Sequence, residues 1–302
     1  MIQVENLTHQ YGDRIALNHI GFEVGKGEIF GLLGPNGGGK STLFRILSTM
    51  MAPTSGRAIL AGYDVERDPA AVRRQIGVVF QTQSLDKALT VEENLRAQGH
   101  LHGLSGADLR SRMESAMERL GILDRRKDLV ETLSGGLRRR VEIAKALLHK
   151  PQVLLMDEAS TGLDPAARRE LSRHVESLRE HEGVTILLTT HILEEADRCD
   201  RLVLLHQGNI VSQGSPQELR SSIGGDVVVL ETVDPKSLAE GIERRFGMKP
   251  VAADGQVRIE IQNGHRFITE VVEAFPGAID SVGLHKPTLE DVFVRETGAS
   301  IA

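Results

Sequence analysis

The sequence has no tryptophan, two tyrosines and one cysteine, and it contains no uninterrupted apolar run as long as a membrane span. With Cys199 alone, no disulfide can form within the chain, and a reducing cytosol is the simplest compartment. The lack of a long apolar run predicts that the chain does not cross a membrane by itself. Residues 1–6 lack a basic segment followed by an apolar one, so we expect no signal peptide.

Basic residues are outnumbered by acidic ones. The 36 lysines and arginines against 42 aspartates and glutamates give a formal net charge of −6, which argues against a nucleic-acid partner. The 302 residues suffice for a sizeable core, arranged either as one large domain with a small one or as two medium ones.

The glycine-rich segment 34–42 reads GPNGGGKST and fits the pattern of Gly, four residues, Gly, Lys and then Ser or Thr. Its glycines let the backbone turn tightly and aim N–H groups at phosphate oxygens. Lys40 supplies a charge between the β- and γ-phosphates, and Ser41 supplies a hydroxyl for Mg²⁺. The apolar run Glu28–Leu33 predicts a buried strand before the loop, and Ser41–Leu47 has the periodicity of a helix that would start at the phosphates. The residues predicted to bind a nucleoside triphosphate here are Gly34, Pro35, Asn36, Gly37, Gly38, Gly39, Lys40, Ser41 and Thr42.

Strands and helices follow one another along most of the chain. Ile2–Leu7 and His19–Val24 alternate apolar and polar residues, which predicts antiparallel strands. Val91–Lys150 has mostly helical spacing of its apolar residues. The apolar runs Gln152–Met156 and Val184–Leu188 are typical of parallel strands, with a predicted helix between them. The pattern therefore predicts an α/β fold with a parallel sheet and helical crossovers.

The glycine pair at 224–225 marks a predicted domain boundary. Residues 227–283 are predicted to run strand, helix, two strands of a hairpin, helix and strand, which is the order of a ferredoxin-like module. A last helix is expected from Pro287 to Thr297. We find no catalytic constellation in this module and expect it to contact protein or to stabilise the chain. The predicted domains are residues 1–222, with a helical subdomain at about 91–150, and residues 226–302.

Polar side chains stand at the ends of the predicted core strands. Because the carboxyl ends of parallel strands meet at one edge of a sheet, we expect Gln81, the Asp157–Glu158 pair and His191 to lie beside the phosphate loop. Asp157 is predicted to hold Mg²⁺ together with Ser41 and Gln81, and Glu158 to orient and deprotonate the attacking water. His191 is predicted to donate a hydrogen bond to the γ-phosphate. The alternatives are that the acidic pair caps the next helix and that the histidine is structural.

Two further features point to the nucleotide. Tyr11 is either a residue packed on the sheet or a stacking platform for adenine. The segment Leu133–Gly136 opens a predicted helix, and its Ser134 hydroxyl, the N–H groups of Gly135 and Gly136 and the helix dipole form a second phosphate-binding surface. Two such surfaces on one chain make sense if two subunits face each other across the nucleotide.

With these motifs in order, residues 1–222 resemble the ATP-binding subunit of an ABC transporter. In that family Tyr11 would stack on adenine, Gln81 would be the Q-loop glutamine, and His191 would be the switch histidine. The remaining matches are the signature at Leu133–Gly136, the Walker B strand at Leu154–Glu158 and the D-loop at Ser160–Asp164.

The chain departs from the common family pattern at three places. Leu137 stands where glutamine usually follows the signature, and Ala159 stands where proline usually follows the catalytic glutamate. Both variants, and the segment Pro287–Phe293, resemble the drug-export and nodulation-type branch, whose membrane partners are ABC-2 permeases. The run Arg138–Arg140 is either a solvated helix face or lies near the interface between signature and nucleotide.

The resemblance implies a RecA-like P-loop NTPase sheet with an antiparallel β-subdomain and a helical subdomain. It implies a homodimer that holds two ATP molecules with Mg²⁺ and an ATPase cycle that drives a separate permease, with export as the expected direction. The permease would dock near Gln81–Leu95, and the subunit would lie in the cytoplasm on the inner face of the membrane. Each site would take Lys40, Ser41, Gln81, Asp157, Glu158 and His191 from one chain and Ser134 and Gly136 from the other.

Two alternatives stay open on the sequence. A soluble ABC ATPase of translation or DNA repair would need no permease, although such proteins usually carry a second nucleotide domain or a long coiled-coil or zinc-bearing insertion. A non-catalytic regulatory subunit would not need Lys40, Glu158 and His191, which are all present. The transported substrate would contact the permease rather than this chain, so drug, lipid, polysaccharide, haem and ion export are all compatible with the sequence.

Overall fold

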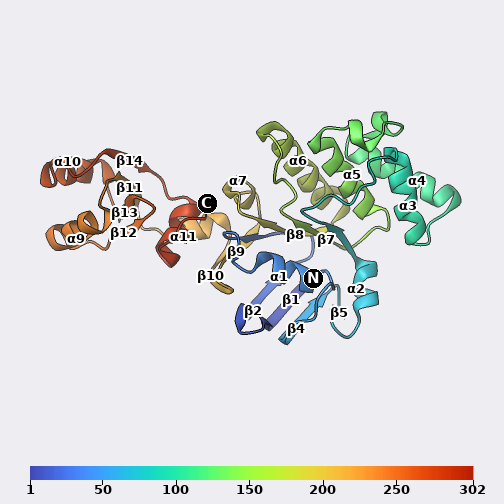
Figure 1. Ribbon diagram of the computed structural model, residues 1–302, viewed down its shortest axis with the longest axis horizontal. Helices are drawn as coiled ribbons and strands as arrows, with labels where there is room; N and C mark the ends of the chain where they lie inside the picture. Colours follow the sequence, from blue (N-terminus) through green and yellow to red (C-terminus); the bar gives the residue numbers. More distant parts are fainter. Residues whose placement is uncertain (302) are drawn as a thin grey trace.

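The computed structural model describes residues 1–301, and these residues form three sheets flanked by helices (Figure 1). The central sheet has the strand order β10-β9-β3-β8-β7-β6. Its strands are parallel except for β10 at one edge, and β3 and β7 are almost fully buried, as parallel strands covered by helices on both faces are. The bounds are β3 Ile29–Leu33, β6 Ile76–Val79, β7 Val153–Asp157, β8 Thr185–Thr190, β9 Arg201–His206 and β10 Asn209–Gly214.

An antiparallel sheet lies against one side of this core, in the order β2-β1-β4-β5. Its inward residues, such as Ile2 and Phe22, share a hydrophobic cluster with Phe44 of helix α1. Strand β2 begins at Arg14 rather than at the predicted His19, because the ladder with β1 continues through register shifts to the pair Tyr11–Arg14. The bounds are β1 Ile2–Tyr11, β2 Arg14–Val24, β4 Ser55–Leu60, β5 Tyr63–Asp64 and α1 Lys40–Leu47.

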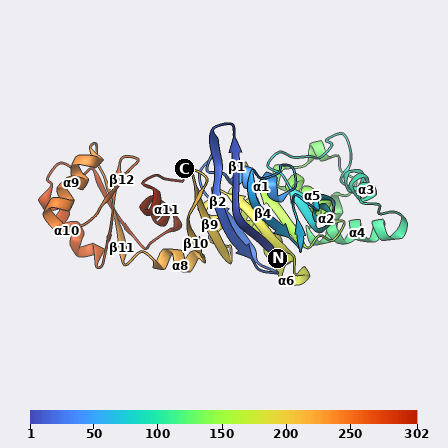
Figure 2. The same ribbon diagram turned by 90° about the horizontal axis from the view of Figure 1, so that it is seen from below.

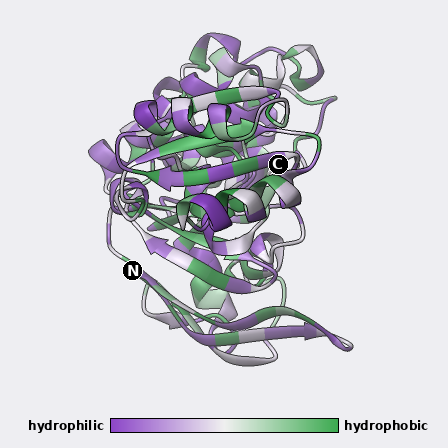
Figure 3. Cartoon of the chain, turned by 90° about the vertical axis from the view of Figure 1, so that its left-hand side faces the viewer, coloured by the Kyte–Doolittle hydropathy of each residue, from purple (hydrophilic) through white to green (hydrophobic). Residues whose placement is uncertain are grey.

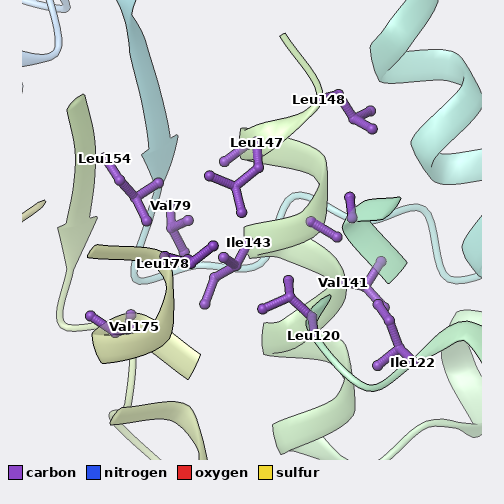
Figure 4. Packing of buried hydrophobic residues seen from close by; sticks show 14 of the residues in the cluster. Val79, Leu120, Ile122, Val141, Ile143, Leu147, Leu148, Leu154, Val175 and Leu178 are labelled. Carbon is purple, nitrogen blue, oxygen red and sulfur yellow. The ribbon is translucent and has the colours of Figure 1, made fainter. Parts of the chain in front are cut away.

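Helices gather on the opposite side of the parallel sheet. Apolar residues of α5 pack on Leu154 of β7 and on residues of α6, among them Leu178, so that the helical region and the sheet share one core (Figure 4). Thr90 caps the start of α3 with a capping box, whereas Ser105, the N-cap residue of α4, makes no side-chain capping hydrogen bond. The bounds are α2 Pro69–Gln75, α3 Val91–Leu101, α4 Gly106–Arg119, α5 Gly135–Leu147, α6 Pro165–Glu182, α7 Leu193–Ala196 and α8 Pro216–Ser221, with short 3₁₀ turns at Leu123–Arg125 and Val130–Thr132.

The C-terminal part forms a sheet of its own, separate from the central one (Figure 2). Its strand order is β12-β13-β11-β14 and all its pairs are antiparallel, which confirms the ferredoxin-like arrangement expected from the sequence. Helices α9 and α10 close a hydrophobic cluster over it, in which Ile242 and Val271 are fully buried. The bounds are β11 Asp226–Glu231, α9 Pro235–Phe246, β12 Val251–Ala253, β13 Gln256–Ile261, α10 Gly264–Ala274 and β14 Ser281–His285.

Helix α11 (Leu289–Thr297) lies between this module and the nucleotide-binding part (Figures 1 and 2). Phe293 and Val292 are fully buried in a cluster with residues of β9 and α8. On the module side, Asp291 of α11 accepts a hydrogen bond from Arg258 of β13 at 2.7 Å. Viewed from the module end, single helices and strands carry both hydrophobic and hydrophilic residues, as expected of elements that bury one face (Figure 3). None of the helices within residues 1–301 combines the length and apolar character needed to span a bilayer.

Candidate active site

The phosphate loop joins β3 to α1, and glycines in it have either a positive φ or too little space for a side chain. Gly39 precedes α1 with φ of 110° and Gly37 has φ of 80°, both in the region that favours glycine. At Gly34 a Cβ atom would lie 2.2 Å from the carbonyl oxygen of Leu205 on β9. The loop is tied to the hairpin after β9 by a hydrogen bond from the Gly208 N–H to the Gly38 carbonyl at 3.0 Å. The backbone is therefore held in one shape by packing as well as by glycine.

We expect Gly34→Ala to destabilise the fold by about 1–3 kcal/mol, because the added methyl meets a backbone oxygen that cannot swing aside. Chemical denaturation of the two proteins measures the difference. Gly224→Ala is the matched control, since a Cβ atom there meets nothing within 4 Å and the φ of Gly224 is not positive. Equal unfolding free energies for the two variants would contradict the packing argument.

Lys40 reaches back over the loop from the first turn of α1. It is 3% exposed, and its Nζ donates to the Gly34 carbonyl at 2.5 Å and to the Pro35 carbonyl at 3.1 Å. Its Nζ also lies 3.3 Å from Oε1 of Glu158. Burial lowers the pKa of Lys40, and the charge of Glu158 opposes that shift. A single buried cation thus links the loop to the acidic residue at the end of β7.

The acidic pair is held by the neighbouring strand β8. Asp157 ends β7, and its Oδ1 accepts a hydrogen bond from Thr189 Oγ1 at 2.6 Å. The Glu158 N–H donates to Thr189 Oγ1 at 3.0 Å, and Glu158 has φ of 42°, so the chain turns sharply after Asp157. Burial raises the pKa of Asp157, and the charge of Glu158 adds to that rise. The sequence had not singled out Thr189, although it stands at the end of the apolar run that predicted β8.

Three residues that the sequence placed at the site converge on the Glu158 carboxylate. Lys40 lies at Oε1, while His191 Nδ1 lies 3.2 Å and Gln81 Nε2 3.5 Å from Oε2. Thr161, from the segment identified as the D-loop, also donates to Oε2 at 3.5 Å, a contact that was not predicted. Glu158 itself is 7% exposed. A nearly buried carboxylate surrounded by donors from separate elements can orient a water molecule and take its proton.

A cavity of about 220 Å³ opens from this cluster along the phosphate loop. Tyr11 borders it and is 44% exposed, its hydroxyl lying 3.2 Å from Met51 Sδ. Arg14 and Arg45 also line the cavity and were not predicted from the sequence. The full lining is Tyr11, Arg14, Ala16, Pro35, Asn36, Gly37, Gly39, Lys40, Ser41, Thr42, Arg45 and Glu158. A cavity lined by cations, by the phosphate loop and by an exposed aromatic ring suits a nucleoside triphosphate.

The signature segment lies elsewhere in the same chain. Ser134 is the N-cap of α5, and its Oγ accepts a hydrogen bond from the Leu137 N–H at 3.3 Å. Within residues 1–301, Ser134, Gly135 and Gly136 are not among the residues that line the cavity. The structure thus brings the loop, Gln81, the acidic pair and His191 together, and it leaves the second phosphate-binding surface outside the lining of that cavity.

The site offers oxygen ligands for a divalent cation. The described residues contain no group of three or more His, Cys, Asp or Glu side chains placed to hold a metal. Mg²⁺ in nucleotide sites does not need one, because it is bound by one or two protein oxygens together with phosphates and water. Asp157, Ser41 and Gln81 offer a carboxylate, a hydroxyl and an amide oxygen, which fits that kind of ligation.

A parallel sheet with a glycine-rich loop before a helix, a carboxylate at the end of a neighbouring strand and a cavity lined by the loop defines a P-loop nucleoside triphosphatase. Comparison with known proteins gives the family. Residues 17–161 match the family described as "ABC transporter". The linearmycin resistance ATP-binding protein LnrL of Bacillus subtilis is 34% identical over 310 residues, which cover 100% of this chain and 99% of that protein.

A second relative and a solved structure support the same family. The daunorubicin resistance ATP-binding protein DrrA2 of Streptomyces coeruleorubidus is 37% identical, covering 98% of this chain and 95% of that protein. The ATP-binding cassette MJ0796, solved as a dimer bound to ADP and Pi, has a TM-score of 0.64 at 26% identity, covering 71% of this chain and 98% of that one. The chain belongs to the ABC transporter ATP-binding proteins and is an ATPase subunit of that class. These relatives give no support to a soluble ATPase of translation or DNA repair.

Proposed function

We propose that two copies of this chain bind two ATP molecules between them and that hydrolysis drives export through a separate membrane permease. The observation that carries the proposal is the convergence of Lys40, Gln81 and His191 on the Glu158 carboxylate beside the phosphate loop. Support for the dimer comes from the MJ0796 cassette. Support for export comes from relatives that are named for drug resistance and match this chain over nearly their full length.

On this proposal the loop and Lys40 hold the triphosphate. The N–H groups of residues 34–42 surround the β-phosphate, and Lys40 Nζ exchanges its loop carbonyl partners for β- and γ-phosphate oxygens. Asp157, Ser41 and Gln81 would hold Mg²⁺, which supplies neutralisation of the phosphate charge. Tyr11 stacks on adenine from the rim of the cavity, where its ring is accessible.

Glu158 is the proposed general base. Its carboxylate accepts the proton of the attacking water, and the hydrogen bonds from Gln81 and Thr161 to Oε2 hold the carboxylate in place. His191 then donates to the γ-phosphate. Thr189 has a positioning role, because it holds both Asp157 and the backbone of Glu158.

The partner subunit completes each site with its signature. Ser134, Gly135 and Gly136 stand at the positive end of α5 and do not line the cavity of their own chain within residues 1–301, so they are available to the nucleotide of the other subunit. A homodimer supplies two equivalent composite sites.

The domain division follows the same proposal. Residues 1–222 form the ATP-binding domain, with the helical subdomain at about 91–150, and residues 226–302 form an accessory domain for protein contact or stabilisation; Ala302 lies outside the described residues. The subunit would lie in the cytoplasm on the inner membrane face, held there by the permease near Gln81–Leu95. By analogy with the named relatives, we propose a drug as the exported substrate.

Affinity purification from detergent-solubilised membranes tests this proposal. We expect the tagged chain to recover a polytopic membrane protein in near-equal amount, identified by mass spectrometry, because the ATPase and the permease form one complex. Purification of the tagged chain from the soluble fraction is the control. A chain found wholly in that fraction together with ribosomes or DNA-processing proteins would contradict the transport proposal and leave the ATPase chemistry standing.

A further inference from the structure

The middle residue of the run Arg138–Arg140 is buried. Arg139 is 3% exposed, so the interpretation of the run as a solvated helix face is wrong at this position. Its Nη1 donates to the Phe80 carbonyl at 2.6 Å and its Nη2 to the Gln81 carbonyl at 2.9 Å. The planar guanidinium suits this task because it presents two donors in a fixed fork. Arg139 therefore holds the backbone of the residue whose side chain reaches Glu158.

Two more residues of α5 hold the same segment. Glu142 Oε1 accepts from the Ser84 N–H at 2.6 Å and from the Ser84 hydroxyl at 3.1 Å, while its Oε2 lies 3.5 Å from Arg139 Nη1. Lys145 Nζ donates to the Ser84 carbonyl at 3.0 Å and to its hydroxyl at 2.8 Å. Arg139, Glu142 and Lys145 are three residues apart and lie on one side of the helix, and together we call them the α5 clamp.

Two residues of the α5 clamp, Arg139 and Glu142, are buried and hydrogen-bonded. The Arg139 and Glu142 side chains are 4% and 3% exposed, so loss of one would leave the other charge buried and unpaired. Each of the two also has hydrogen bonds to the backbone of residues 80–84, which pair both terminal nitrogens of Arg139 and Oε1 of Glu142 and leave Arg139 Nε without a partner. The segment that carries Gln81 is thus hydrogen-bonded to α5 at Phe80, Gln81 and Ser84.

We propose that Arg139 and Glu142 are positioning residues for ATP hydrolysis, which set the place of Gln81 relative to Glu158 from the helix that begins at the signature. The inference rests on the proposed roles of Gln81 and of Ser134. Since Ser134 caps α5 and Arg139 lies on its second turn, engagement of the signature by one nucleotide is transmitted through α5 to Gln81 at the other nucleotide. The clamp thereby links the two ATP sites of the dimer.

The first test compares Arg139→Gln with Arg140→Gln in the full-length protein. Arg140 is the matched control, because it is the next arginine on α5 but binds the Leu120 carbonyl and Glu170 instead of segment 80–84. We expect Arg139→Gln to lower kcat by about 10–100-fold, since a misplacement of about 1 Å at a reacting group has effects of this size. ATP affinity, measured by titration, should change by less than about twofold, because Lys40 and the loop are untouched. A purely structural effect would instead lower affinity and thermal stability together.

The second test repeats Arg139→Gln in a Gln81→Ala background, under single-turnover conditions so that slow rates stay measurable. If Arg139 acts through Gln81, the second substitution adds little further loss. An equal loss in both backgrounds, or an equal loss in Arg140→Gln, would overturn the inference. Should Arg139→Gln fail to fold, Arg139→Lys takes its place, since lysine keeps the charge but has a single nitrogen for two carbonyls.

Hydrogen exchange gives a readout that does not depend on hydrolysis. Arg139→Gln and Glu142→Gln should speed exchange of the Ser84 amide, whose N–H donates to Glu142, with little change in the parallel sheet. Unchanged exchange at Ser84 in both variants would overturn the clamp. Glu158→Gln separates the two proposals. If it hydrolyses ATP like the wild type, the proposed role of Glu158 as the general base fails, whereas normal kcat in Arg139→Gln beside an inactive Glu158→Gln contradicts the inference alone.

Discussion

Glu158→Gln is expected to lower kcat for ATP hydrolysis by about 10²–10⁴-fold while ATP stays bound between two subunits. The amide keeps the shape of the side chain and can still lie near Lys40 and His191, but it cannot accept the proton of the attacking water. On the proposed function, hydrolysis of ATP lets the two subunits separate. A subunit that binds ATP without hydrolysing it should therefore accumulate as a dimer. Steady-state ATPase assays and size-exclusion chromatography with ATP measure the two effects.

The control for this experiment is Glu194→Gln, an exposed carboxylate on the short helix α7 that follows His191. It should keep the wild-type rate and elute as the wild type does. Wild-type hydrolysis by Glu158→Gln would show that another group is the base. Loss of hydrolysis without any ATP-dependent dimer would leave the base in place and argue against the shared site.

Most of the residues around Glu158 could be predicted from the sequence, and the reason is the topology of the sheet. Gln81, Glu158 and His191 each follow a short apolar strand, and parallel strands joined by helices must end at one edge of the sheet. The phosphate loop is marked still more strongly, because only a few residue types satisfy its turns, as the 2.2 Å approach of a Cβ atom at Gly34 illustrates. The roles of these residues in hydrolysis stay proposals that the variants above test.

The parts that the sequence did not predict depend on pairing between distant segments. Thr189 reaches Asp157 because the register of β7 and β8 sets them side by side, and no local pattern marks that register. Arg139 contacts the backbone of Gln81 and Phe80, which lie 58 and 59 positions earlier in the chain. Its burial could therefore not be predicted from a helical pattern with charged residues on both sides of it. Local periodicity tells which residues share a helix face, whereas only the fold decides what covers that face.

Lys40→Ala is expected to weaken ATP binding by about 10–100-fold, the size of effect for losing a hydrogen bond between charged groups. The triphosphate loses the one buried cation that the loop offers within residues 1–301, and the N–H groups that remain cannot replace a full charge. The variant also leaves the Gly34 and Pro35 carbonyls and the Glu158 carboxylate without their common donor. Equilibrium titration with ATP measures the affinity.

Because those orphaned acceptors also affect stability, the unfolding free energy has to be measured beside the affinity. Lys26→Ala, which removes an exposed lysine in the turn before β3, is the matched control and should alter neither quantity. If Lys40 contacts the γ-phosphate as well as the β-phosphate, ADP, which lacks the γ-phosphate, should lose less affinity than ATP in Lys40→Ala. Unchanged ATP affinity in a folded Lys40→Ala protein would contradict the role proposed for Lys40, and an equal loss for ADP and ATP would place its charge at the β-phosphate alone.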